Sequence, residues 1–266
     1  MEQMNILIAN DDGPEAEGLG ALRSAARTAY PGATVVTLSP KAPLGGQGLS
    51  VTPKPLDEFT VEEVACQFYI ADAKPADLMY LGLGQPERFL KQGSFDLVLT
   101  GINHGENIGM DVFHSGTVGM AMLASTFFST PAVAFSQQGN NKTMDDRQLK
   151  DRSDFIVRFL RSEPKSTARC WNVNFPATDP VGWKICSVAN HSRFRPFKAE
   201  NRKHEGCDVI GLEGGFIVLS PLCLNVGPPA SRSSRTTVDA LHWACDLDRV
   251  CLVRFGEIGQ ANQYPR

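Results

Sequence analysis

The sequence lacks any apolar run close to the roughly 20 residues that a membrane-spanning helix needs. It also lacks an excess of basic residues, because 26 lysines and arginines stand against 29 aspartates and glutamates, for a formal net charge of −3. These absences argue against an integral membrane protein and against a general affinity for nucleic acid or anionic membranes. Residues 1–4 show neither the basic end nor the apolar run of a signal peptide, so we expect a cytoplasmic protein with no membrane or nucleic-acid partner.

The cysteines follow no disulfide or metal-binding pattern. There are seven of them, an odd number, and no Cys-x-x-Cys pair occurs. Most lie in apolar segments, as Cys186 does within residues 184–188, where a thiol packs as a small hydrophobe. We therefore expect reduced, structural cysteines, and a chain of 266 residues is long enough to bury a core without disulfides.

Several enzyme motifs are also missing. No Gly-x-Gly-x-x-Gly follows the first apolar segment, which argues against a nicotinamide or flavin enzyme, and the Gly-Lys-Ser/Thr ending of a Walker loop is absent. Ser115 is not part of a Gly-x-Ser-x-Gly motif, so a Ser-His-Asp hydrolase is unsupported, and His114 is best interpreted as a loop histidine. A haloacid-type phosphatase would need Asp-x-Asp, whereas Asp11 and Asp12 are adjacent.

The arrangement of apolar segments predicts an α/β fold. Strand-like and helix-like runs alternate through the first 136 residues, which is typical of a parallel sheet covered by helices. The expected strands are 6–9, 34–38, 95–100, 131–136 and 170–175, with weaker ones at 59–61, 67–70 and 185–189. Helices are expected from residue 19 to near Pro31 and over 76–82, 117–128 and 151–161, and a hairpin over 209–222 around Glu213-Gly214-Gly215.

Two adjacent carboxylates, Asp11 and Asp12, follow the buried strand expected at 6–9. In open α/β sheets, ligands bind beyond the carboxyl ends of the strands. Adjacent carboxylates repel each other, and a hard cation would relieve that repulsion. Asp-Gly is also a strong turn pair and Asp a common helix cap, so on these residues alone a plain turn is the favoured interpretation.

A second strand end carries Asn103, in a stretch rich in glycine and asparagine that follows residues 95–99. Its amide oxygen is an acceptable ligand for Mg²⁺ or Mn²⁺ beside carboxylates, and it could equally stabilise a turn. Farther along, Ser115-Gly116-Thr117 stands at the start of an expected helix, whose free N–H groups and partial positive charge suit a phosphate. The simpler interpretation of Ser115 is a helix N-cap.

Together these pieces describe a divalent cation facing a phosphate, an arrangement suited to the hydrolysis of phosphate esters. At this point the chain resembles the SurE-type survival-protein phosphatases, or 5′/3′-nucleotidases. The resemblance rests on residues 10–13 (Asn-Asp-Asp-Gly) with Gly18, on residues 101–112, and on residues 115–119 (Ser-Gly-Thr-Val-Gly). Weaker matches are residues 74–77, 172–176 and 215–222.

The resemblance implies a Rossmann-like, three-layer α/β fold with a mostly parallel sheet and a projecting C-terminal β-hairpin. Residues 1–190 would form the catalytic domain, and residues 191–266 an arm, hairpin and tail, continuous with the main fold, that join subunits into a homodimer or homotetramer. It also implies hydrolysis of nucleoside 5′(3′)-monophosphates with one divalent metal ion, Mg²⁺ or Mn²⁺. By position, Asp11 and Asp12 would be catalytic, Asp11, Asp12 and Asn103 would bind the metal, and Asn107, Ser115, Gly116 and Thr117 would bind phosphate.

The loop after the second expected strand departs from the family pattern. The family has a serine ligand and two arginines in this loop, whereas this chain reads Pro-Lys-Ala-Pro-Leu-Gly-Gly from Pro40, which puts Gly45 at the serine position. Glycine has no side-chain oxygen, so a water, a backbone carbonyl or Ser39 from a shifted loop would have to replace it, and Mg²⁺ commonly keeps several waters. The alternative to an active enzyme is therefore a catalytically weakened homologue that still binds a nucleotide or phosphate.

Overall fold

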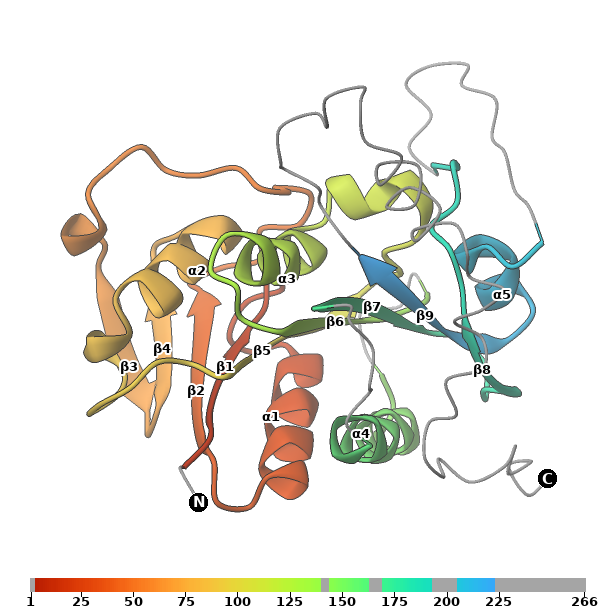
Figure 1. Cartoon of the computed structure of the whole chain (residues 1–266), viewed down its shortest axis with the longest axis horizontal. Helices are drawn as coiled ribbons and strands as arrows, with labels where there is room; N and C mark the ends of the chain where they lie inside the picture. Colours follow the sequence, from red (N-terminus) through yellow and green to blue (C-terminus); the bar gives the residue numbers. More distant parts are fainter. Residues whose placement is uncertain (1–2, 140–143, 163–168, 193–204, 223–266) are drawn as a thin grey trace, which may run out of the picture.

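Nine strands form a single sheet in the order β3-β4-β2-β1-β5-β6-β7-β9-β8 (Figure 1). The structure is a computed structural model that describes residues 3–139, 144–162, 169–192 and 205–222. The strands are β1 (Asn5–Ala9), β2 (Thr34–Pro40), β3 (Val61–Ala65), β4 (Phe68–Ala71), β5 (Leu97–His104), β6 (Ala132–Gln137), β7 (Cys170–Phe175), β8 (Gly182–Ile185) and β9 (Phe216–Leu222). Neighbouring strands are parallel from β4 to β7 and between β9 and β8, and antiparallel at β3–β4 and β7–β9. The predicted α/β class with a mostly parallel sheet is confirmed.

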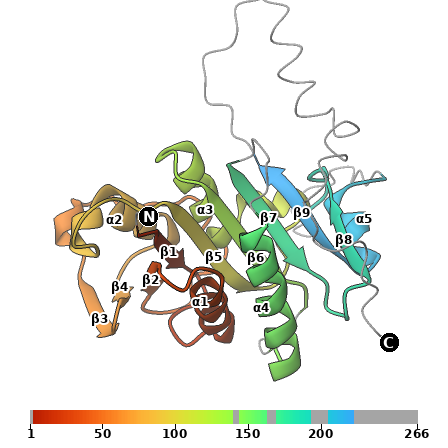
Figure 2. The ribbon, with the colours of Figure 1, turned by 60° about the horizontal axis from the view of Figure 1, so that its bottom comes forward.

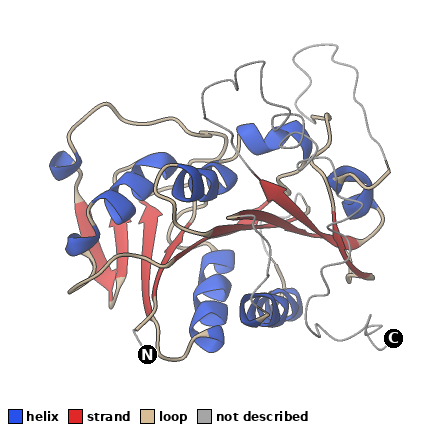
Figure 3. Cartoon of the chain, in the orientation of Figure 1, coloured by secondary structure: helices blue, strands red, loops and turns tan. Residues whose placement is uncertain are grey.

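Helices cover both faces of the sheet and give the three layers (Figures 1 and 3). The helices α1 (Glu17–Ala29) and α4 (Asp146–Arg161) lie on one face, and α2 (Pro75–Gly84) and α3 (Gly116–Thr126) lie on the other. A short helix, α5 (Asp208–Glu213), packs against β9, and 3₁₀ turns occupy Leu56–Glu58, Pro86–Arg88 and Gly109–Phe113. Among the described residues, no helix is both long and apolar enough to cross a membrane.

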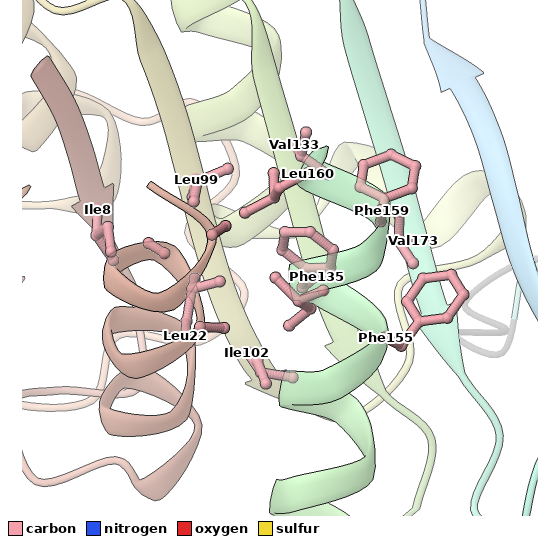
Figure 4. Close-up of a cluster of buried hydrophobic side chains, with 14 of the residues drawn as sticks. Ile8, Leu22, Leu99, Ile102, Val133, Phe135, Phe155, Phe159, Leu160 and Val173 are labelled. Atoms are coloured by element: carbon pink, nitrogen blue, oxygen red, sulfur yellow. The ribbon is translucent and has the colours of Figure 1, made fainter. Parts of the chain in front are cut away.

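Apolar side chains of α1 and α4 fill the space against the sheet (Figure 4). Leu22 of α1 packs near Ile8 and Leu99, while Phe155 and Phe159 of α4 pack towards the β6 and β7 side chains. Helix α4 begins before the expected residue 151, because the Asp145 carboxylate caps it by accepting the Gln148 N–H. Its first turn is polar, so apolar periodicity alone could not show where it starts.

The hairpin expected over 209–222 is wrong, because the first half of that stretch is α5. Val209 and Leu212 are buried at helical spacing, and Gly211 lets the helix approach β9, where a Cβ at Gly211 would lie 2.7 Å from Val218 Cγ1. Strand β9 then enters the sheet between β7 and β8 (Figure 2). A helix followed by a strand that packs against it can thus show the same apolar pattern on both sides of a Gly-Gly turn as a β-hairpin does.

The strand expected at 185–189 lies earlier, at β8, and only an isolated bridge from Ser187 to Cys207 continues it. Much of the predicted C-terminal arm, at residues 193–204 and 223–266, lies outside the described residues, and so does any projecting hairpin that those residues would form. Strand β9 and helix α5 belong to that predicted arm by sequence, yet β9 is part of the same sheet and α5 packs against β9. The division at residue 190 stays a prediction.

Candidate active site

The parallel pairing of β1 and β5 brings two polar strand ends to one edge of the sheet. Ala9 pairs with Thr100, so the residues that follow β1 lie beside the last residues of β5. Asp11 and Asp12 therefore come close to Asn103 and His104, as the strand-end argument predicts. A hydrogen bond of 2.9 Å from the His104 N–H to Asp12 Oδ2 joins the two strand ends directly.

Hydrogen bonds hold the acid pair from two sides. Asp11 is 2% exposed, and its Oδ1 accepts a hydrogen bond of 2.5 Å from the Thr117 hydroxyl, while Asp12 is half-buried. The ion pairs within the described ranges join Arg147 to Asp151 and Asp179, and Lys150 to Asp154, so no lysine or arginine there pairs with Asp11 or Asp12. Of the described basic side chains, His104 acts on the pair, because its charge lowers the pKa of Asp12, less strongly than burial raises it.

Burial and mutual repulsion perturb both carboxyl groups. Burial, and then the charge of Asp12, raise the pKa of Asp11 to about 6, against the lowering effect of hydrogen bonds from Thr117. Burial likewise raises the pKa of Asp12, against the hydrogen bond from the His104 N–H. Both shifts show that this place in the protein disfavours uncompensated negative charge, which is the condition that a bound cation would relieve.

Asn103 presents its oxygen to the same place. Its Nδ2 donates to the Gly105 carbonyl at 2.7 Å, and its Oδ1 lies 3.3 Å from the Thr117 hydroxyl that also contacts Asp11. Two carboxylates and one amide oxygen form an oxygen-only donor set, which suits Mg²⁺ or Mn²⁺ rather than zinc. The described residues contain no cluster of three or more His, Cys, Asp or Glu side chains that could hold a metal, so water would complete the coordination of an ion at this site.

The start of α3 lies against Asp11. A Cβ at Gly116 would lie 2.6 Å from Asp11 Oδ2 and 2.8 Å from Pro75 Cγ, so only glycine fits beside this carboxylate. Ser115 is the N-cap of α3, where its Oγ accepts the Val118 N–H at 3.0 Å, as the simpler sequence interpretation has it. The N-terminal end of the helix and its partial positive charge therefore face the acid pair.

Asn107 is fixed by three polar side chains of the neighbouring strands. Its N–H donates to Asn174 Oδ1 at 2.8 Å, and its carbonyl accepts from Asn172 Nδ2 at 2.7 Å and from Asn174 Nδ2 at 3.0 Å. Its own Nδ2 donates to Ser136 Oγ at 2.9 Å. Residues 172–176 match the family pattern only weakly, and the signal for their role is two asparagines, at i and i+2, on one face of an otherwise apolar strand.

The loop that carries Gly45 reaches the acid pair. The Leu44 N–H donates to the Asp11 carbonyl at 2.7 Å, and a Cβ built on the exposed Gly45 meets no atom within 4 Å. Ser39 is fully buried, and its hydroxyl donates to Asn10 Oδ1 at 2.7 Å, so it stabilises the turn before Asp11 instead of replacing the family serine. His114 is exposed in the turn before α3.

Comparison with known proteins finds relatives over most of the chain. The family model described as "Survival protein SurE" matches residues 6–195. A protein of Paramagnetospirillum magneticum named 5′-nucleotidase SurE is 31% identical over 84% of this chain and 91% of its own length. A protein of the same name from Vibrio vulnificus strain YJ016 is 36% identical over 82% of this chain and 89% of its own length.

A solved structure supports the same assignment. The crystal structure of SurE from Aquifex aeolicus superposes with a TM-score of 0.67 at 27% identity, and the match covers 90% of this chain and 99% of that one. This structural similarity joins the sequence similarity over most of the chain. On these grounds the chain belongs to the SurE family of survival proteins.

Proposed function

We propose that this protein is a divalent-metal-dependent phosphomonoesterase that hydrolyses nucleoside 5′(3′)-monophosphates to nucleoside and phosphate. The observation that carries the proposal is the pair of Asp11, which is buried, and Asp12, which is half-buried, beside the N-terminal end of α3, with no lysine or arginine of the described residues paired to either. Relatives that are named 5′-nucleotidase SurE support the reaction and the substrate class. As the family resemblance implies, we also propose that the chain works as a homodimer or homotetramer.

The proposed roles follow from the contacts. Asp11, Asp12 and Asn103 would hold one Mg²⁺ or Mn²⁺, which when bound supplies Lewis acidity towards the phosphoryl group. Asn107 and the first turn of α3, with Ser115, Gly116 and Thr117, would hold the phosphate oxygens at the positive end of the helix. A carboxylate of the acid pair would orient the attacking water and take its proton.

The test is hydrolysis of a chromogenic phosphate monoester and of a panel of nucleoside monophosphates with added Mg²⁺ or Mn²⁺. We expect turnover that EDTA abolishes and that Asp11→Asn lowers by at least about 100-fold, because the variant removes a ligand charge and a proton acceptor. Asp57→Asn, at an exposed carboxylate outside the site, serves as the control. Turnover that survives both EDTA and Asp11→Asn would contradict the metal role.

The second candidate, a weakened homologue that binds nucleotide with little turnover, is favoured by the glycine at position 45. Because a side chain at Gly45 meets open space, Gly45→Ser can restore the family hydroxyl without a steric clash. A gain in turnover of about tenfold or more, absent in the control Gly32→Ser, would favour this candidate. High turnover of the unmodified protein, with no gain from the serine, would dismiss it.

A further inference from the structure

The hydroxyl of Thr117 points into the protein, towards the acid pair. Thr117 is 0% exposed, and its Oγ1 lies 2.5 Å from Asp11 Oδ1 and 3.3 Å from Asn103 Oδ1. Both contacts are to expected metal ligands. A side chain that binds phosphate directly would have to present its hydroxyl to the substrate, whereas this one is enclosed between two protein oxygens.

A threonine hydroxyl has one proton to donate. Asp11 Oδ1 and Asn103 Oδ1 are both acceptors, and the shorter contact is to the carboxylate, which is the stronger acceptor when ionised. A proton that is held by Asp11 is not available to a phosphate oxygen. The Thr117 hydroxyl therefore donates its hydrogen bond to the Asp11 carboxylate and not to a phosphate.

The surroundings of Thr117 keep this contact in place. The Thr100 hydroxyl of β5 donates to the Thr117 carbonyl at 2.8 Å and so ties the first turn of α3 to the sheet. On the other side of the carboxylate, Asp11 Oδ2 lies against the Cα of Gly116. The Asp11 carboxylate is thus enclosed by two consecutive residues of the helix, one through a hydrogen bond and one through close contact.

We propose that Thr117 is a positioning residue whose hydroxyl orients Asp11 towards the cation, so that any contact of Thr117 with the phosphate is made by its backbone and not by its side chain. The proposal rests on the proposed metal site and narrows the role of the first turn of α3. Within that turn, Ser115 and Gly116 remain to face the substrate, while the Thr117 side chain organises the metal ligands.

The experiment compares Thr117→Val, which keeps the shape but lacks the hydroxyl, with Thr117→Ser, which keeps the hydroxyl. Thr126→Val, in the last turn of the same helix, is the matched control. Mn²⁺ binding to the full-length protein without substrate is measured by electron paramagnetic resonance of the free ion. The affinity for inorganic phosphate is then measured as competitive inhibition at saturating Mn²⁺.

We expect Thr117→Val to weaken Mn²⁺ binding by about tenfold or more, and Thr117→Ser and the control to stay within about twofold of the wild type. Phosphate inhibition at saturating Mn²⁺ should stay within about twofold for all variants. If Thr117→Val binds Mn²⁺ as tightly as the wild type, whether or not phosphate inhibits it less, the positioning role of Thr117 is wrong. The proposed function would not be affected by that result. A wild-type protein that binds no Mn²⁺ would overturn the proposed function and this inference with it.

Discussion

At the scale of single residues, the carboxyl group of Asp11 ties stability to pH. Its pKa of about 6 in the folded protein exceeds the ordinary value of 3.8, so the folded state holds the proton more tightly than the unfolded state. This contribution to stability is fully present below about pH 4 and is lost as the pH rises through 6. Above that range the ionised, buried carboxylate costs about 3 kcal/mol in the metal-free protein.

We therefore predict that Asp11→Asn is more stable than the wild type at about pH 7.5 in EDTA, by up to about 3 kcal/mol, and that the difference shrinks towards about pH 4. Mn²⁺ should raise the melting temperature of the wild type much more than that of the variant, because ligand binding stabilises the folded state. Urea denaturation at the two pH values and melting curves with Mn²⁺ check both parts. If the difference in the free energy of unfolding between the wild type and the variant does not vary with pH, the pKa of Asp11 is not raised.

Part of the site could be predicted from residue order alone. Asp11 and Asp12 follow β1 and Asn103 lies at the end of β5, and the rule that parallel strands end at one edge brings them together without a structure. The partner of the Thr117 hydroxyl could not be predicted, because a helix start offers hydrogen bonds to phosphate and to carboxylate alike. The hydrogen bonds of Asn172 and Asn174 with Asn107 depend on which strands become neighbours in the sheet. The spacing of these residues along the chain does not reveal which strands those are.

At the scale of secondary-structure elements, two glycines of α1 have opposite roles. A Cβ at Gly18 would overlap the Ile102 carbonyl of β5, whereas a Cβ at Gly20 meets nothing within 4 Å. Gly18 therefore lets α1 pack directly on the strand that leads to Asn103. Gly20 has no such contact and only lowers the helical propensity of α1.

We predict that Gly18→Ala destabilises the protein by about 2 kcal/mol or more through that clash, while Gly20→Ala stabilises it by about 0.5–1 kcal/mol. Gly20→Ala is the internal control, since both substitutions add one methyl group to the same helix. Free energies of unfolding from urea titrations distinguish them. Equal effects of the two substitutions would show that α1 does not pack on β5 as closely as described here.

The central strands could be predicted from sequence because they are largely apolar and are buried on both faces. Strand β7 occupies Cys170–Phe175, the predicted range, and β6 differs from its prediction by one residue at each end. Helix α5 was mistaken for a strand because six residues are too few for helical periodicity to stand out. Its helical form depends on packing against β9, which is a tertiary effect.

At the scale of the whole molecule, the sheet order predicts one cooperative unit. Strand β9 lies between β7 and β8, so β8 is joined to the rest of the sheet only through a segment that comes later in the chain. We predict coincident urea transitions by far-UV circular dichroism and by tryptophan fluorescence, to which Trp171 in β7 and Trp183 in β8 contribute. An earlier fluorescence transition would instead indicate a C-terminal part that unfolds by itself.

The hydrogen bond from the Leu44 N–H to the Asp11 carbonyl restricts how this protein can diverge from its relatives. An insertion or deletion between Pro40 and Gly48 would pull on the backbone of Asp11, a proposed metal ligand, whereas an exchange of exposed side chains in this loop would leave that bond intact. Evolution can therefore vary the chemistry of the loop more freely than its length. Gly45, where the family pattern has a serine, differs in its side chain and leaves the length of the loop unchanged. A change of one codon would restore the serine.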